Sequence, residues 1–189
     1  MLALALCLSY ALGCVSPGWW LVRRTTGGDL RSEGSGGTGA TNAARVLGPG
    51  GFVLVLLLDA AKAVLAVSLA RRLTHADPWH ALALPLVVAG HIWPVTLRFR
   101  GGKGAGPLLG GCVALNPWFA VAAAVPAALT AVFKRRTFAI TSAAAAGGIG
   151  CAWWLLPDLP ARVAFASAVG LVLVAHRTHF ARMFNHSVP

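Results

Sequence analysis

A glycine-rich loop between residues 27 and 42 has the composition of an anion-binding site. Closely spaced glycines let backbone N–H groups converge on one anion. Ser35 and Thr41 add hydroxyl donors, and Arg45 adds a guanidinium that can grip a phosphate through two parallel hydrogen bonds. The alternative is a flexible linker, which the alternation of hydroxyl and amide groups with the glycines disfavours.

A second candidate is the run Gly101-Gly102-Lys103-Gly104, directly before an apolar segment. Backbone donors, a helix N-terminus and an ammonium would all face one phosphate there. The run lacks the glycine spacing and the Ser or Thr of a Walker A loop. Its alternative role is to anchor lipid headgroups. His91, ten residues upstream, is either a base or a hydrogen-bonded interior histidine.

The third candidate lies after the last apolar segment, where His176, His179 and Arg182 are spaced three apart. They share one face if the helix continues. The alternative is an ordinary basic anchor at the membrane surface.

Asp59 and Lys62 stand three residues apart inside an apolar segment. Such a pair can neutralise itself on one helical face. An ionisable pair within a span is a functional candidate, and the alternative is a packing pair that faces the bundle interior.

The composition of the 189 residues indicates a membrane protein, with 57% hydrophobic and 11% charged residues and a mean hydropathy of +0.72. A soluble domain carries roughly a quarter charged residues. The net charge of +11 is spread between apolar segments, which favours lipid headgroups and phosphorylated substrates over nucleic acid as partners. We therefore expect no nucleic acid and one all-α membrane domain over residues 1–189.

A span needs roughly 20 apolar residues. The candidate segments are 2–22, 52–70, 80–97, 105–115, 117–133, 138–156 and 160–175. The segment 105–115 is too short to cross alone, so it either pairs with the next segment by turning at Asn116-Pro117 or forms a buried half-helix. We predict a polytopic bundle of about seven membrane-embedded helices, with five or six as the alternative.

The basic residues predict the orientation. If seven segments alternate, twelve Lys and Arg residues fall on one side and three on the other, namely Arg71, Arg72 and Arg162. The positive-inside bias then places the N-terminus outside and the C-terminus in the cytoplasm. Three motifs that suit phosphate share the cytoplasmic side.

Together these motifs resemble the PlsY-type acyl-phosphate:glycerol-3-phosphate acyltransferases of bacterial membranes. The matching residues run in order along nearly the whole chain: Gly34-Ser35-Gly36, Gly39-Ala40-Thr41-Asn42, Arg45, Leu47-Gly48, Leu58-Asp59, Lys62, His91, Pro94-Val95, Phe99-Arg100-Gly101-Gly102-Lys103-Gly104, His176-Arg177 and Arg182.

The resemblance implies a multi-pass enzyme of the plasma membrane that transfers a fatty acyl group from acyl phosphate to the 1-hydroxyl of glycerol 3-phosphate. The products would be lysophosphatidic acid and phosphate, and no metal, organic cofactor or obligatory protein partner is expected. The residues expected to be catalytic are Ser35, Lys103, His91 and His176. Those expected to bind substrate are Gly34, Gly36, Gly39, Thr41, Asn42, Arg45, Gly101, Gly102, Gly104, His179 and Arg182.

The chain also departs from the family pattern at four places. Gly37 replaces an Asn, Ala105-Gly106-Pro107 replaces Val-Ala-Thr, His179-Phe180 replaces Asn-Ile, and His186-Ser187-Val188 replaces a Gly-x-Glu ending. These changes keep open a non-catalytic or altered-acceptor relative that binds lipid phosphate. A small transporter is disfavoured, because no inverted repeat is detectable and Asp59 and Lys62 are the only central ionisable pair.

Overall fold

The computed structural model describes residues 1–119, 121, 154–156 and 158–185, with side chains as far as Arg177. All regular elements in this part are helical, which agrees with the all-α prediction. The α-helices are α1 (Leu2–Cys14), α2 (Pro17–Thr26), α3 (Ala40–Leu73), α4 (Ala83–Ile92), α5 (Ala105–Leu115) and α8 (Leu159–Asn185). Three short 3-10 turns join them: η1 (Leu30–Ser32), η2 (Pro78–Leu82) and η3 (Val95–Leu97).

The first apolar segment is broken, whereas the sequence suggested one helix over 2–22. α1 ends at Cys14, Val15 is extended, and α2 starts at Pro17. The physical reason is Pro17, which disfavours the helical conformation at the residue before it, and Ser16 is indeed non-helical. Together the two helices cover Leu2–Thr26, which is long and apolar enough to cross a membrane.

α3 is longer than the predicted span 52–70 and contains a kink. Gly48 adopts a left-handed φ of 71° inside the helix, and Pro49 follows it. The left-handed conformation is one that glycine adopts at little cost. The 34 residues would extend about 51 Å if straight, well beyond a hydrocarbon core of ~30 Å. Residues 40–47 therefore form a separate helical segment before the apolar part of α3.

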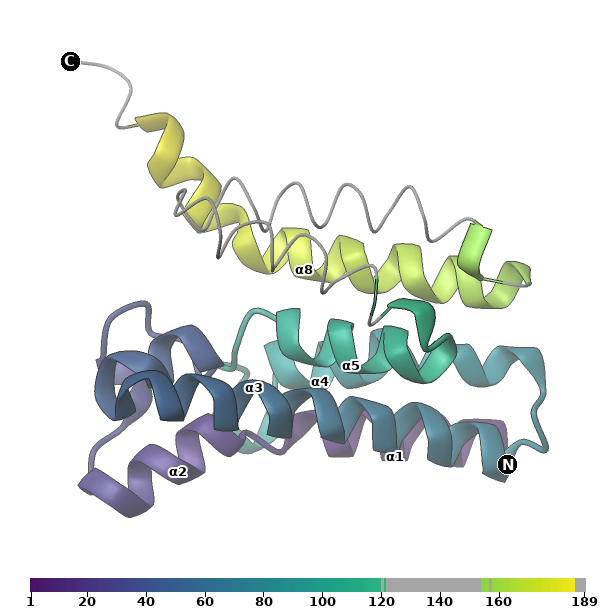
Figure 1. The fold of residues 1–189 in the computed structure, drawn as a ribbon, viewed down its shortest axis with the longest axis horizontal. Coiled ribbons are helices and arrows are strands. Elements are labelled where there is room, and N and C mark those ends of the chain that lie inside the picture. The colour runs from purple at the N-terminus through teal and green to yellow at the C-terminus, as the bar shows by residue number, and fades with distance from the viewer. Residues whose placement is uncertain (120, 122–153, 157, 186–189) are drawn as a thin grey trace.

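Small residues allow close contact between the helices. A methyl group built on Gly90 would overlap the carbonyl of Tyr10, and one built on Gly110 would overlap the carbonyl of Ala60. Glycine at such contacts is the usual means by which membrane helices approach closely. α1 thus packs on α4, and α5 packs on α3 with Gly106 against Asp59. α8 lies across α4 and α5 (Figure 1).

The described residues contain four helices able to span a membrane, over Leu2–Thr26, Ala40–Leu73, Pro78–Leu97 and Leu159–Arg177. The short fourth segment is confirmed as α5, with the predicted limits of 105 and 115. α8 continues past the predicted 175 to Asn185. The segments 117–133 and 138–156 lie largely outside the described residues, so the count of seven remains a prediction.

Figure 1 shows how the loops are distributed. The loop before α3, the start of α5 and the C-terminal part of α8 lie toward the left end of the molecule. The N-terminus and the turn between α3 and α4 lie at the right end. The three sequence motifs therefore gather toward one end of the bundle.

Candidate active site

The side chain of Asn42 organises the first glycine-rich loop. Asn42 is 2% exposed. Its amide oxygen accepts hydrogen bonds from the Ser35 N–H at 3.0 Å and from Arg45 Nη1 at 3.1 Å. Its amide nitrogen lies 2.8–3.0 Å from three loop carbonyls, those of Leu30, Glu33 and Gly37, so two of them share one of its two N–H groups. All of these contacts are internal, so Asn42, which was expected to bind substrate, shapes the loop.

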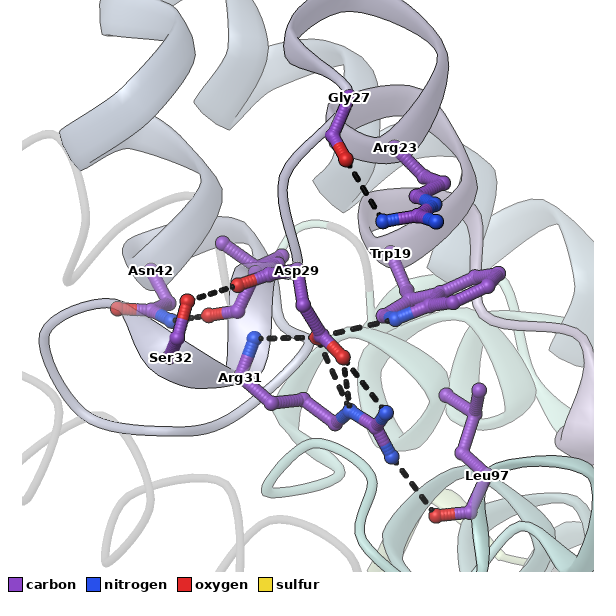
Figure 2. Close-up of polar contacts among 9 residues, drawn as sticks. Trp19, Arg23, Gly27, Asp29, Arg31, Ser32, Asn42 and Leu97 are labelled. Carbon is purple, nitrogen blue, oxygen red and sulfur yellow. Dashed lines mark hydrogen bonds and ion pairs between the residues drawn. The ribbon is translucent and has the colours of Figure 1, made fainter.

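Asp29 and Arg31 tie this loop to its neighbours (Figure 2). The Asp29 carboxylate receives hydrogen bonds from Trp19 Nε1 at 3.1 Å and from the Arg31 guanidinium at 2.7–3.2 Å. Arg31 Nη1 also donates to the carbonyl of Leu97 at 3.1 Å. The hydrogen bonds from Arg31 lower the pKa of the Asp29 carboxyl to about 2.

Sequence reasoning missed the role of this pair, because Arg31 is one of the twelve basic residues that were used only to predict the orientation. The signal that could have predicted the ion pair is the spacing of an acidic and a basic residue, two apart within a glycine-rich stretch. The pair fixes the loop to α2 on one side and to η3 on the other.

The first loop presents donors on its open side. Gly34 and Gly36 have φ of 47° and 71°, which explains glycine at these positions. Within the described residues, the N–H groups of Gly37 and Gly39 make no intramolecular hydrogen bond. The first two N–H groups of α3 follow directly and have no intrahelical partner. The loop therefore leads into the N-terminus of α3, where an anion is favoured.

The polar side chains of this loop border the same N-terminus. Ser35 and Thr41 are exposed, and so is Arg45. A methyl group on Gly34 would overlap the Arg45 guanidinium, which therefore lies against the loop. Hydroxyls, a guanidinium and backbone donors thus stand within one short stretch, and their role in binding substrate stays a prediction.

The second loop folds back onto the end of α4. The Gly101 N–H donates to the Ile92 carbonyl at 3.1 Å, and the Gly102 N–H donates to the His91 carbonyl at 3.0 Å. A methyl group on either glycine would overlap α4 atoms. These two N–H groups were expected to face phosphate, and the structure instead uses them to hold the loop. Lys103, whose side chain is half-buried, and Gly104, with φ of 86°, then lead into α5.

The two loops meet directly. The Thr38 N–H donates to the Gly101 carbonyl at 3.3 Å. A methyl group on Gly37 would lie 3.6 Å from that same carbonyl oxygen and 4.0 Å from the Gly102 Cα. The structure therefore brings the first and second motifs together.

His91 lies in the interior, 2% exposed. Its Nδ1 is 3.0 Å from Lys62 Nζ and 3.3 Å from Asp59 Oδ1. Asp59 and Lys62 form an ion pair of 2.9 Å. The pair thus faces the bundle interior, and His91 is enclosed beside it. Its catalytic role stays a prediction from sequence.

The third motif is carried by α8, which continues as a helix through all three of its residues. His176 is half-buried, and its Nδ1 lies 2.8 Å from the Val172 carbonyl. Val172 itself packs against Gly104 of the second loop. His176 stands one turn beyond that contact. The side chains of His179 and Arg182 lie outside the described ones.

Within the described residues, no three His, Cys, Asp or Glu side chains form a group that could hold a metal ion.

Comparisons with known proteins show which family the sequence resembles. The family model described as glycerol-3-phosphate acyltransferase matches residues 3–186. The chain is 40% identical over 185 residues to glycerol-3-phosphate acyltransferase 1 of Desulfitobacterium hafniense (strain Y51), covering 95% of this chain and 89% of the relative. It is 38% identical over 189 residues to glycerol-3-phosphate acyltransferase of Anaeromyxobacter dehalogenans (strain 2CP-C), with coverage of 96% and 92%.

The fold also matches a solved structure. A crystal structure of PlsY, an integral membrane glycerol 3-phosphate acyltransferase, in its glycerol 3-phosphate form superposes with a TM-score of 0.86 at 26% identity. The match covers 98% of this chain and 92% of that one.

Proposed function

The chain belongs to the glycerol-3-phosphate acyltransferase family, and from that premise we propose that it acylates the 1-hydroxyl of glycerol 3-phosphate with acyl phosphate as the donor. The products are lysophosphatidic acid and inorganic phosphate. The reaction is a step of phospholipid synthesis, and residues 1–189 act in it as one membrane domain.

The observation that carries the proposal is the meeting of the two phosphate-type loops at one end of the bundle. The Thr38–Gly101 hydrogen bond joins them. One loop supplies hydroxyls, free N–H groups and Arg45, and the other supplies Lys103 at the start of α5. Two anionic substrates need such a concentration of donors, because their phosphates otherwise repel each other.

The proposed chemistry requires positioning more than a protein nucleophile. An acyl phosphate is already activated, so the glycerol hydroxyl can attack the carbonyl carbon directly, and the carbon–oxygen bond to phosphate breaks. The phosphate departs with the bonding electrons. Donors aimed at the developing negative charge lower the barrier, and holding both substrates together removes much of the entropic cost.

We assign the roles as follows. Ser35, the Gly37 and Gly39 N–H groups and the start of α3 hold the acyl-phosphate group, and Arg45 and Lys103 neutralise the substrate phosphates. Gly34, Gly36, Gly101, Gly102 and Asn42 keep the loops in shape, which is supported by their backbone conformations and internal hydrogen bonds. His176, His179 and Arg182 serve the acceptor from α8. The hydroxyl proton passes to a histidine or to a substrate phosphate.

The proposed location is the bacterial plasma membrane, with the N-terminus outside and the site in the cytoplasm. The twelve-to-three distribution of basic residues supports it. Single cysteines at Ser32 and Arg100, both exposed, labelled with an impermeant reagent, should react only from the cytoplasm, and one at Asp77 should react only from outside. Labelling of Ser32 and Arg100 from opposite faces would exclude a shared site.

A second candidate is a relative that binds acyl phosphate without transferring it to glycerol 3-phosphate. The departures at Gly37, 105–107, 179–180 and 186–188 favour it specifically. In that case the first loop would retain its ligand and the acceptor would differ.

One assay separates the two functions. Protein purified into lipid is incubated with palmitoyl phosphate and glycerol 3-phosphate, and lysophosphatidic acid is measured together with released phosphate. Ser35→Ala and Arg45→Ala should abolish most turnover, whereas Arg24→Ala, which removes an exposed cation of α2, should not. Tight binding of palmitoyl phosphate with no lysophosphatidic acid formed would exclude the proposed transfer and favour the second candidate.

A further inference from the structure

The buried ammonium of Lys62 joins parts of the chain that are far apart in sequence. Lys62 Nζ donates to the carbonyl of Gly13 at 3.1 Å and to that of Val15 at 2.6 Å, and it lies 3.0 Å from His91 Nδ1. An ammonium has three N–H donors, so the two carbonyls use two of them, and the third is available to His91 Nδ1 if this nitrogen carries no proton. Asp59 Oδ1, 2.9 Å away, balances the charge without hydrogen-bond geometry.

The two carbonyls lie at the break between α1 and α2. The last carbonyls of a helix have no intrahelical partner, and a buried carbonyl without one is costly. Lys62 satisfies two of them from α3. The ammonium therefore stabilises the break that Pro17 creates, and α2, which follows it, leads directly into the first loop.

The third acceptor determines the state of His91. If Nδ1 accepts from Lys62, the neutral ring carries its proton on Nε2. A methyl group built on Gly102 would overlap Nε2, so this side of the ring lies directly against the second loop. The His91 carbonyl holds the Gly102 N–H as well. Both the ring and the backbone of His91 thus set the position of the loop that carries Lys103.

We propose that Lys62 is a positioning residue of the acyl-transfer site, acting through the α1–α2 break on the first loop and through the His91 ring on the second. The proposal rests on the proposed function for its kinetic effect only. Lys62 itself is 8% exposed, so we assign it an effect through its neighbours and no contact with substrate. Lys62 thereby keeps the two loops at a fixed distance from each other. The reaction needs this fixed distance if both substrate phosphates are to be held at once.

The kinetic test uses a double variant, Asp59→Asn with Lys62→Met. Removing Lys62 alone would leave a buried carboxylate without its counter-charge and destabilise the fold, whereas the double variant removes both charges. We expect a folded protein whose kcat falls on the order of tenfold to a hundredfold, as for a catalytic group displaced by about 1 Å, with a smaller change in KM. Ser9→Ala, which removes a buried hydroxyl bonded only within α1, is the matched control and should keep its kcat.

A second measurement needs no turnover. In protein labelled with 15N-histidine and placed in bilayers, the His91 signals are identified by their loss in His91→Gln. Wild type should show a protonated Nε2 and a bare Nδ1, and the double variant should lose this single tautomer. A protonated Nδ1 in wild type, or a folded double variant with unchanged kcat, would overturn the proposal. Absence of turnover in wild type would instead refute the proposed function. The tautomer measurement alone would then decide whether Lys62 positions the His91 ring.

Discussion

Replacing Gly102 by alanine places a methyl group against the imidazole of His91. The built Cβ overlaps Nε2 and lies 2.8 Å from Cε1 and 3.0 Å from Cδ2, so it meets the ring along a whole edge. The ring cannot easily turn away, because its Nδ1 is held beside Lys62. The loop must therefore move. Overpacking of this kind typically costs about 1–3 kcal/mol.

The expected effect of Gly102→Ala on catalysis is larger than its effect on stability. A displacement of about 1 Å of the loop shifts Lys103 with it and should lower kcat roughly a hundredfold. The assay is phosphate release from palmitoyl phosphate in the presence of glycerol 3-phosphate, together with a thermal unfolding curve to establish that the protein is folded.

Gly50→Ala in α3 is the matched control, since Gly50 is exposed and its methyl group would meet no atom within 4 Å. It should keep kcat within about threefold. A folded Gly102→Ala protein with the kcat of wild type would refute the reasoning, because it would mean that the second loop tolerates displacement without losing activity.

The other predictions concern charge and the family departures. Lys103→Ala should lower kcat by about a hundredfold or more, as does the loss of one transition-state donor. Its thermal unfolding curve should match that of wild type, which establishes that the variant is folded. Gly37→Asn restores the family residue at a position with room for a side chain, so KM for glycerol 3-phosphate should fall, and an unchanged KM would mean that the departure is neutral. For Asp29, the pKa is lowered to about 2, so its contribution to stability is present above about pH 4 and disappears as pH falls toward 2. The carboxyl is 35% exposed, and solvent screening reduces that contribution to about 1 kcal/mol. The Tm difference between wild type and Asp29→Asn should therefore shrink as the pH falls from about 4 to 2. A constant difference would mean that the ionised Asp29 carboxylate is not its cause.

The sequence predicted local features well where the signals are themselves local. α5 has the predicted limits because Gly104 precedes it and Asn116-Pro117 ends it. The ion pair of Asp59 and Lys62 follows from a spacing of three residues on one helix. The grouping of the motifs at one end followed from counting alternating segments, and the meeting of Thr38 with Gly101 agrees with it.

The features that were missed depend on contacts between distant residues. Gly101 and Gly102 looked like phosphate donors, yet their N–H groups are taken by carbonyls of α4, which only the folded chain brings close. Asn42 looked like a ligand of substrate, but five internal partners occupy its amide. No sequence pattern distinguishes a glycine that binds a ligand from one that permits a close backbone approach.

The shortness of α5 has a consequence for how the two substrates reach each other. Gly106 at its start lies against Asp59, eleven residues along α3 from the kink at Gly48, which corresponds to about 16 Å. Lys103 lies three residues before this contact and two residues after Gly101, which accepts a hydrogen bond from Thr38, so the start of α5 connects the two loops to the apolar part of α3. In the proposed reaction, the donor's hydrocarbon tail can stay among the lipid chains while its phosphate reaches this ammonium. The water-soluble acceptor can then arrive from the aqueous end, so the two reactants approach along different routes.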